Sequence, residues 1–325
     1  ADVNREKLDQ IDYYNSGDSK DYYTLQLDSQ ELVPGNDRLG TPTGYSNVRI
    51  SDAVTVNGAW SGSNSDGWVF TPTADNANVQ TSDLEAKIRY GTVSITTVNS
   101  SGTQLGSIYV DDDVSQFNSD TSFQNTLHLD AHGIIEVNDY ILMDNNNQYS
   151  TNHIRLEAVG DIFISANVST QGDDIYYDKT SSNNASSGDI HIISGSKVSI
   201  AASITASGVN NTYSNSTYGY AFDSGSIYIE GNGGVSIGGN LSAVGGDAYT
   251  STRDGSSNNI EINTGYGSLT TDGTNDGQTS GVISGLNFTK SGSGVLQLTG
   301  SNTWTGYTDV SSGTLMMGSS GSIPS

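Results

Sequence analysis

The chain has 325 residues, of which 33% are hydrophobic, 39 are glycine and none is cysteine. Its 36 acidic residues outnumber 12 basic ones, and the formal charge of −24 repels nucleic acid and anionic membranes, which excludes both as partners. The lack of cysteine excludes disulfides, and no stretch reaches the roughly 18 apolar residues of a transmembrane helix. This apolar fraction is low for a globular core and favours an elongated repeat fold.

Residues 1–45 are polar and rich in tyrosine, and we interpret them as a cap or as the remainder of a preceding region. The chain begins with neither Met nor a signal peptide, and it ends at Ser325 in the middle of a pattern. We therefore expect a piece of a longer protein, with any export signal or membrane anchor outside it.

A six-residue step between two apolar pairs predicts that coil-like structure begins near residue 48. The pairs are Val48/Ile50 and Val54/Val56. Three large aromatic residues follow: Trp60, Trp68 and Phe70. The open end of a stack of strands exposes unpaired backbone groups, so we expect these aromatic side chains to cover that end.

Residues 82–89 form the only amphipathic stretch, which is too short to be a stable helix without packing. An irregular copy of a three-beat apolar pattern comes next. Its beats are Val93/Ile95, Ile108/Val110 and Val114.

Four regular copies of this pattern follow, and each beat is a period-2 segment bounded by turn-forming residues. Within each copy the beats start eight and then six residues apart. The copies are Leu127/Leu129, Ile135/Val137, Ile141; Ile154/Leu156, Ile162/Ile164, Val168; Ile190/Ile192, Val198/Ile200, Ile204; and Ile227/Ile229, Val235/Ile237, Leu241. Three strands per repeated unit predict an all-β solenoid, in which Ile162, Val198 and Val235 stack in register.

The copies start 27, 36 and 37 residues apart, with 33 more to Ile260, and nearly all of this variation follows the third beat. We therefore expect the inserted segments 170–188, 207–225 and 244–258 at one corner of the stack. This corner is the natural candidate for a functional face. The alternative is a set of surface loops, whose length varies at little cost.

Tyrosines mark the inserted segments. The candidate ligand-binding residues are Tyr176, Tyr177, Tyr213, Tyr218, Tyr220 and Tyr249. A tyrosine offers a flat apolar face and a hydroxyl group, which suit contacts to sugars or to proteins. Alternatively these rings, together with Phe222, pack back onto the coils and hold the long loops down.

Carboxylate patterns for catalysis or metal binding are weak. Residues 111–113 are three consecutive Asp, but neighbours in an extended chain point opposite ways, which favours a solvated corner. Residues 272–277 are similar to a calcium loop, yet Ile283 stands where such a loop needs Glu. We therefore predict no enzyme activity, no cofactor and no metal site.

The histidines are too dispersed in sequence to predict a site. They are His128, His132, His153 and His191. Because His128 and His191 alternate with apolar residues, we expect both to point outward.

Two groups of segments resemble known families. Those similar to the repeats of filamentous-haemagglutinin-like exoproteins are 84–88, 92–97, 106–110, 127–138, 156–164 and 188–192. Residues 292–306 (GSGVLQLTGSNTWTG) and 313–315 resemble the passenger-associated transport repeat of bacterial autotransporters. The resemblance implies a right-handed parallel β-helix from an exported bacterial surface protein, usually an adhesin. It also implies an outer-membrane translocator outside this fragment.

Beyond about residue 269 the rhythm of the apolar segments changes, and Gly-rich turns separate them. We predict three regions: a polar segment or cap at 1–45, a β-helix with haemagglutinin-like repeats at 46–280, and further coils with the transport-type repeat at 281–325. The tyrosine-rich insertions are not part of either family pattern.

The function we expect is that of the passenger fragment of a secreted or cell-surface bacterial adhesin, on the extracellular side of the outer membrane. Its corner insertions would bind a glycan or protein on a host or neighbouring cell and so support cell adhesion and biofilm formation. Two alternatives stay open. One is a polysaccharide lyase or hydrolase, which needs carboxylates and an Arg or Lys converging in a cleft. The other is a passive stalk or matrix protein.

Overall fold

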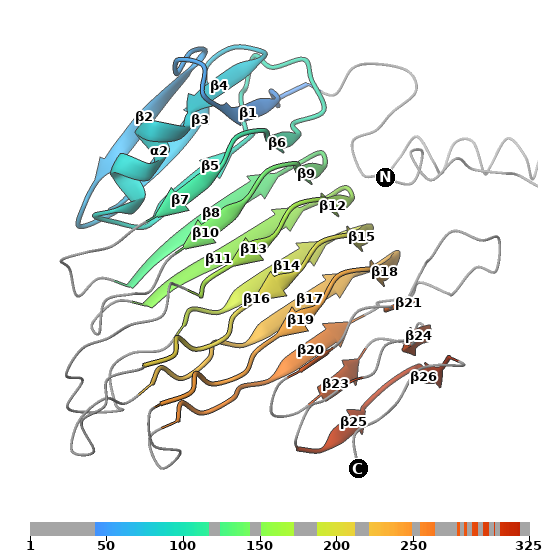
Figure 1. Ribbon diagram of the computed structural model, residues 1–325. Helices are drawn as coiled ribbons and strands as arrows, with labels where there is room; N and C mark the ends of the chain where they lie inside the picture. Colours follow the sequence, from blue (N-terminus) through green and yellow to red (C-terminus); the bar gives the residue numbers. More distant parts are fainter. Residues whose placement is uncertain are drawn as a thin grey trace, which may run out of the picture.

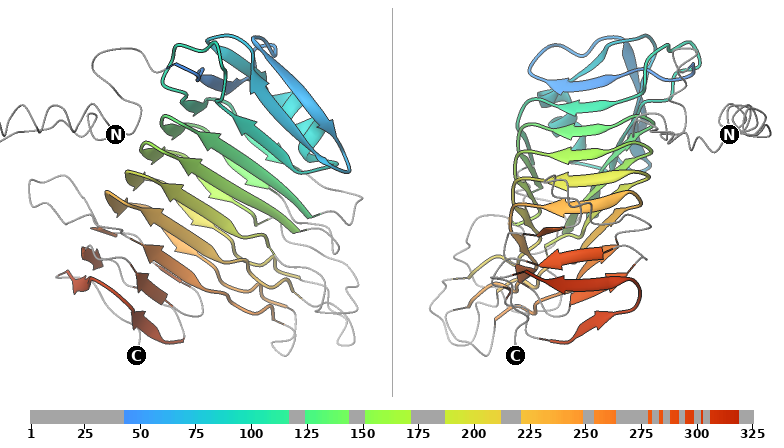
Figure 2. Two further views of the ribbon diagram at one scale, coloured as in Figure 1. Left: turned by 180° about the vertical axis from the view of Figure 1, so that it is seen from behind. Right: turned by 90° about the vertical axis from the view of Figure 1, so that its right-hand side faces the viewer.

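The computed structural model describes residues 43–116, 124–143, 151–171, 187–211, 221–248, 254–263, 278–279, 283–284, 288–291, 295–298, 302 and 306–318. Within these residues the strands form three sheets, and successive coils each add one strand to a sheet (Figure 1). Figure 2 shows the coils stacked as layers. The chain is nearly all β with parallel sheets, which is consistent with the predicted β-helix solenoid.

The three sheets correspond to the three beats of the repeat. Sheet I takes the first beat and contains, in spatial order, β2 (Gly58–Ser63), β3 (Gly67–Pro72), β5 (Val93–Thr96), β8 (Gln124–Ala131), β11 (Thr151–Ala158), β14 (Ile190–Ser194), β17 (Ile227–Gly231), β20 (Ile260–Asn263), β23 (Phe288–Ser291) and β25 (Thr308–Val310). Sheet II takes the second beat and contains β4 (Ala77–Gln80), β1 (Val48–Ser51), β6 (Ile108–Val110), β9 (Ile135–Val137), β12 (Ile162–Ile164), β15 (Lys197–Ile200), β18 (Gly234–Ile237), β21 (Gln278–Thr279), β24 (Val295–Leu298) and β26 (Thr314–Met317). Sheet III takes the third beat and contains β7 (Val114–Gln116), β10 (Ile141–Met143), β13 (Val168–Ser169), β16 (Ile204–Thr205), β19 (Leu241–Ser242) and β22 (Ile283–Ser284).

The predicted aliphatic ladders line the interior of the stack. Ile162 of β12 pairs with Val198 of β15, and Val198 pairs with Val235 of β18, all in parallel register. These three side chains are at most 1% exposed. Each buried aliphatic side chain contributes about 1.5–3 kcal/mol relative to its exposed state, so the repeated pattern supplies the core coil by coil. The predicted stacking is confirmed.

A short helix takes the third-beat position of the first coil. The chain runs from β3 in sheet I to β4 in sheet II and then into α2 (Thr81–Ile88), which lies beside β7 (Figure 1). Leu84 and Ile88 of α2 are fully buried, and Glu85 Oε1 accepts a hydrogen bond from the Ser115 amide at 2.8 Å. Packing against the stack therefore stabilises a helix that is too short to persist alone.

The aromatic residues near this end of the stack pack over it. Phe70 is fully buried, and its ring lies 5.2 Å from that of Trp60 in an edge-on arrangement. The Lys87 ammonium of α2 lies 4.9 Å from the Trp60 ring and 4.8 Å from the Trp68 ring, within cation–π range. Phe70 therefore belongs to the buried core, in register with Ile95, and the two Trp rings pack against Lys87 at this end of the stack.

The prediction that Val54 and Val56 continue the first coil is wrong. Their side chains are 65% and 43% exposed, and Val56 pairs antiparallel with Asn78 at the edge of β4. The chain reverses direction here, because Asn57 has a positive φ of 55° and leads into the antiparallel hairpin of β2 and β3. The apolar spacing alone did not reveal this reversal.

Candidate functional site

The predicted binding residues Tyr176, Tyr177, Tyr213, Tyr218, Tyr220 and Tyr249 lie outside the described residues. The structure does describe where each inserted segment leaves the stack and where it rejoins it. These ends decide whether the three insertions share a corner.

The two ends of each inserted segment contact each other. The contacts are hydrogen bonds of Thr170 Oγ1 to Gly188 O at 2.7 Å, Phe222 N to Val209 O at 3.0 Å, and Gly255 N to Gly246 O at 2.8 Å. Each insertion therefore departs and returns at one point, so that its length does not change the path of the coil.

The ends of successive insertions also bond to one another. The hydrogen bonds are Gln171 Nε2 to Gly208 O at 3.2 Å, Gly208 N to Val244 O at 2.8 Å, Ser187 N to Asp223 O at 2.9 Å, and Ser224 N to Ser256 O at 2.9 Å. A parallel bridge joins Asn211 to Ala248. The described ends therefore stack at one corner, between sheet III and sheet I, as the spacing predicts.

Close backbone contacts at this corner require glycine. A Cβ on Gly208 would lie 1.9 Å from the Phe222 carbonyl oxygen, and one on Gly255 would lie 1.8 Å from the same atom. The Phe222 side chain is fully buried. For this one aromatic residue of the insertions, the burial agrees with the alternative that the rings pack inward, although Phe222 lies outside the main hydrophobic cluster.

Polar side chains cover the outer face of sheet I, directly after the insertions rejoin the stack. One row runs in register through five coils and consists of His128, Arg155, His191, Tyr228 and Glu261. A second row, two residues further along each strand, consists of Asp130, Glu157, Glu230 and Asn263, with the apolar Ile193 between Glu157 and Glu230. We call these two rows the polar face. Because adjacent strands are about 4.8 Å apart, equivalent side chains lie within reach of each other.

Three residues of β8 and β11, at the N-terminal end of the polar face, form a cluster of ionisable side chains. Glu157 Oε2 lies 2.7 Å from His128 Nε2, and Glu157 Oε1 accepts a hydrogen bond from the Arg155 guanidinium. Arg155 also lies 3.5 Å from His191 Nδ1 in the next coil. The hydrogen bond from Arg155, and with it that from His128, lowers the pKa of the Glu157 carboxyl.

Tyr228 extends this chain of contacts to the following coil. Its ring centroid lies 5.8 Å from that of His191, and its hydroxyl donates a hydrogen bond to Glu230 Oε2 at 2.5 Å. Burial of the phenol and the bond to Glu230 raise the pKa of Tyr228 to about 12. Tyr228 therefore remains a neutral donor at physiological pH.

The histidines are less dispersed than the sequence suggests. His128, His153 and His191 all belong to strands of sheet I, and the residues beside His128 and His191 are buried, so both point outward as expected. His153 Nδ1 accepts the Asp189 amide at 2.9 Å, and burial lowers the pKa of this imidazole. The sequence does contain a signal for the polar face. It is the residue between the two apolar residues of each first beat, because these residues become neighbours once the coil spacing is applied.

A family model described as Passenger-associated-transport-repeat matches residues 288–316. This match supports an autotransporter passenger. It implies that the passenger is secreted or displayed at the cell surface. No curated protein and no solved structure matches the chain.

The matched segment continues the stack. It begins with β23, which pairs in parallel with β20, and it contains β24 and β25 and most of β26. Phe288 and Lys290 stand in register with the buried Ile260 and Ile262, and both are fully buried. The Lys290 ammonium donates a hydrogen bond to the Ser312 carbonyl at 3.3 Å, and burial lowers its pKa.

The described residues include one helix and several His, Asp and Glu side chains that bear on membranes and metals. This helix is neither long nor apolar enough to cross a membrane. Among the same residues, no three His, Asp or Glu side chains gather as metal ligands would.

Proposed function

We propose that this passenger is a fragment of a secreted or cell-surface bacterial adhesin of the filamentous-haemagglutinin-like type, folded as a right-handed parallel β-helix. Its contact surface consists of the three corner insertions and the adjoining polar face. The handedness follows the general rule that connections between parallel strands are right-handed in about 98% of cases.

The observation that carries the proposal is the stacking of the insertion ends. Three long segments, rich in tyrosine, leave the stack from successive coils at one corner and rejoin it beside the polar face. Repeat proteins concentrate their insertions on the binding side in this way. Tyrosine supplies contact area at low entropic cost, which suits a surface that binds a glycan or a protein.

The proposed partner is a glycan or protein on a host cell or on a neighbouring bacterium. The charge of −24 disfavours nucleic acid and anionic membranes as partners. The proposal requires no cofactor, and it places the outer-membrane translocator outside this fragment.

Trimming the insertions tests the proposal. Because the ends of each insertion are hydrogen-bonded to each other, residues 172–186, 212–220 and 249–253 can each be replaced by a short Gly-Ser link. The trimmed passenger should keep its β circular dichroism and its thermal stability but lose attachment to host cells and to a glycan array. Unchanged attachment by a folded trimmed chain would support a passive stalk or matrix protein instead.

Substitution of the tyrosines distinguishes the contribution of their side chains from that of the length of the insertions. Changing Tyr176, Tyr177, Tyr213, Tyr218, Tyr220 and Tyr249 together to Ser keeps the length of the insertions and should weaken attachment at least tenfold. The matched control is Tyr140→Ser, which removes a half-exposed tyrosine from the turn before β10. Equal loss in both variants would contradict a role for the insertion tyrosines.

A polysaccharide lyase or hydrolase is the second candidate. What favours it is the contact of Arg155, Glu157 and His128, which brings a cation, a carboxylate and an imidazole together on the polar face. This candidate predicts that uronate-containing or neutral polysaccharides lose length on incubation with the chain, and that Glu157→Gln stops the cleavage. We propose instead that the cluster is a non-catalytic part of the contact surface, so no reducing ends or unsaturated products should appear.

A further inference from the structure

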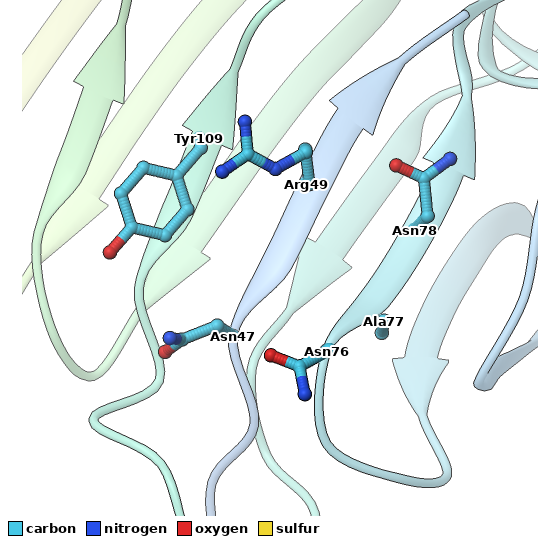
Figure 3. A pocket seen from close by; sticks show the side chains of 6 residues that line it. All are labelled: Asn47, Arg49, Asn76, Ala77, Asn78 and Tyr109. Carbon is cyan, nitrogen blue, oxygen red and sulfur yellow. The ribbon is translucent and has the colours of Figure 1, made fainter. Parts of the chain in front are cut away.

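A polar hollow of about 250 Å³ lies at the first coils, on the outer face of sheet II. Strands β4, β1 and β6 line it with Asn47, Arg49, Asn76, Ala77, Asn78 and Tyr109 (Figure 3). In that view Arg49 and Tyr109 lie at one end of the hollow, and Asn47 and Asn76 lie at the other. In a chain with 36 acidic residues, none of the six lining residues is acidic.

Strand alternation places these side chains, except the buried Ala77, on one face. Val48 and Ile50 of β1 and Val79 of β4 are fully buried, so the residues between them point outward. Register then aligns Asn78, Arg49 and Tyr109 across the three strands.

Asn78 forms a wall of the hollow. Its amide nitrogen donates to the carbonyls of Ala53 and Val54 at 2.7 and 3.2 Å, and its Oδ1 accepts the Ser51 hydroxyl at 2.8 Å. The amide of Asn78 is thereby committed to the chain segment that crosses the edge of β4.

Asn47 offers a free donor. Its Oδ1 accepts the backbone amides of Gly106 and Ser107 at 3.1 and 2.9 Å. A backbone N–H can only donate, so this contact fixes which end of the side-chain amide is oxygen. The described residues place no acceptor at the NH2 group of Asn47, which is left for a ligand.

Asn76 is oriented in the same way through Gln104. Oε1 of Gln104 accepts the amides of Asn47 and Asn76, both at 2.9 Å, so Nε2 of Gln104 is the donor to Asn76 Oδ1 at 2.7 Å. As with Asn47, no described residue accepts a hydrogen bond from the NH2 group of Asn76. Two pre-oriented amide donors therefore lie at one end of the hollow.

Arg49 supplies positive charge at the other end. Its guanidinium lies 5.3 Å from the centre of the Tyr109 ring and forms an ion pair with Asp111. Half of the side chain is exposed, and a guanidinium has five N–H donors, so donors remain for a ligand. Asp111 is also bound by the Asn138 amide at 2.8 Å, which holds this carboxylate beside the hollow.

We propose that the hollow binds the carboxylate-bearing sugar of an acidic glycan, such as a uronate or a sialate. The hollow presents almost only donors, and a carboxylate is an acceptor-only group that Arg binds in a bidentate manner. The amides of Asn47 and Asn76 then donate to ring or hydroxyl oxygens, while Tyr109 provides an aromatic edge and a hydroxyl. Pockets for drug-sized ligands are roughly 300–1,000 Å³, so this hollow suits one sugar ring.

This site is independent of the contact surface proposed above, because the insertions lie between sheets III and I and the hollow lies on sheet II. The test is titration calorimetry or ligand-observed NMR with methyl glycosides of glucuronate, galacturonate and sialate, and with the neutral glucoside and galactoside. We expect at least one acidic glycoside to bind at least tenfold more tightly than the neutral ones. No binding of any acidic glycoside, or equal binding of acidic and neutral ones, would overturn the proposal.

Three variants locate the site. Asn47→Asp and Asn76→Asp keep the Oδ1 acceptor that holds the fold and replace the NH2 donor by a carboxylate oxygen, and Arg49→Gln removes the charge. Each should weaken binding at least tenfold at unchanged melting temperature. If one of the three variants has a lowered melting temperature, the binding affinities of the other two test the location of the site.

The control is Asn167→Asp. Asn167 is exposed, and its Oδ1 likewise accepts a backbone amide, from Ser203 at 3.0 Å, but it lies in the turn between sheets II and III. This variant adds the same charge and should bind as the parent does, and so should the chain with trimmed insertions. Loss of binding on trimming, or equal loss in Asn167→Asp, would place the sugar elsewhere and overturn the proposal.

Discussion

His128 and Glu157 are 29 residues apart in the chain, yet His128 Nε2 lies 2.7 Å from Glu157 Oε2. The contact exists because β8 and β11 stack in parallel, with His128 beside Arg155 and Leu129 beside Leu156. It joins two coils on the outside, as the aliphatic ladders join them on the inside.

Glu157→Gln should reduce stability in a pH-dependent way. The pKa of Glu157 is lowered in the folded chain, chiefly by Arg155, so its stabilisation is present above the unfolded value near 4.5 and is lost as the pH falls through the folded value. For such partly exposed pairs we expect a loss of about 0.5–1 kcal/mol at neutral pH and a smaller loss at pH 3. Urea unfolding at both pH values measures this.

Glu136→Gln is the matched control, since it removes a carboxylate from sheet II for which the described residues supply no ion-pair partner. A deficit of equal size at both pH values in Glu157→Gln would contradict the ionic origin of the effect.

Ile200→Ala should cost about 2–5 kcal/mol, as for other buried aliphatic truncations. Ile200 is 1% exposed and stands in register between Ile164 and Ile237, so the lost side chain leaves a gap in the ladder. Ile200→Asp should prevent folding, because it buries an unpaired charge. Circular dichroism and thermal melting measure both. Ser199→Asp, on the outer face of the same strand, should fold normally; if it failed as Ile200→Asp does, the inward assignment would be wrong.

The sequence was sufficient for the parts of the fold that repeat. Period-2 apolar segments at fixed spacing determine which side chains point inward, and stacking then has one register that buries them all, as Ile162, Val198 and Val235 demonstrate. The first coil does not repeat. There α2 replaces a strand, and Val56 pairs with Asn78 instead of entering the core, so the apolar spacing predicted the wrong path for the chain.

The candidate site was predicted less well. The polar face depends on which residues of different coils become neighbours, and this follows from register rather than from any local motif. Arg155 and Glu157, two residues apart, look like an ordinary solvated pair until His128 and His191 are placed beside them. The corner was predicted because insertion length is visible in the sequence, whereas the six tyrosines within it stay a prediction.

Gly188→Ala should destabilise the chain by about 3 kcal/mol, the upper end of the range for overpacking. Its new Cβ would lie 1.7 Å from the Asn152 carbonyl oxygen, a backbone atom that cannot move aside without breaking the stack. Gly238→Ala is the matched control, because its Cβ would meet Ile200 O at an ordinary 3.6 Å. Thermal melting compares the two. Similar melting temperatures would show that the corner tolerates bulk and is not closely stacked.

The phenol of Tyr228 should lose its proton at a higher pH than an ordinary tyrosine. Its pKa is about 12 in the folded chain, so a pH jump should show one phenolate appearing near that pH in the parent and missing in Tyr228→Phe. A raised phenol pKa contributes stability that is fully present below pH 10 and is lost as the pH rises toward about 12. In urea the same phenol should titrate near 10. A parent-minus-variant signal centred near 10 in the folded state would contradict the burial of the phenol and its bond to Glu230.

The hydrogen-bonded ends of the insertions have a consequence for how this architecture diversifies. Phe222 N donates a hydrogen bond to Val209 O, and Gly255 N donates one to Gly246 O. The two ends of an inserted segment are therefore held together independently of the residues between them. A segment of different length can replace one insertion between its hydrogen-bonded ends, while the insertions of the neighbouring coils stay unchanged. The three inserted segments can thus be exchanged separately while the coils that carry them stay the same.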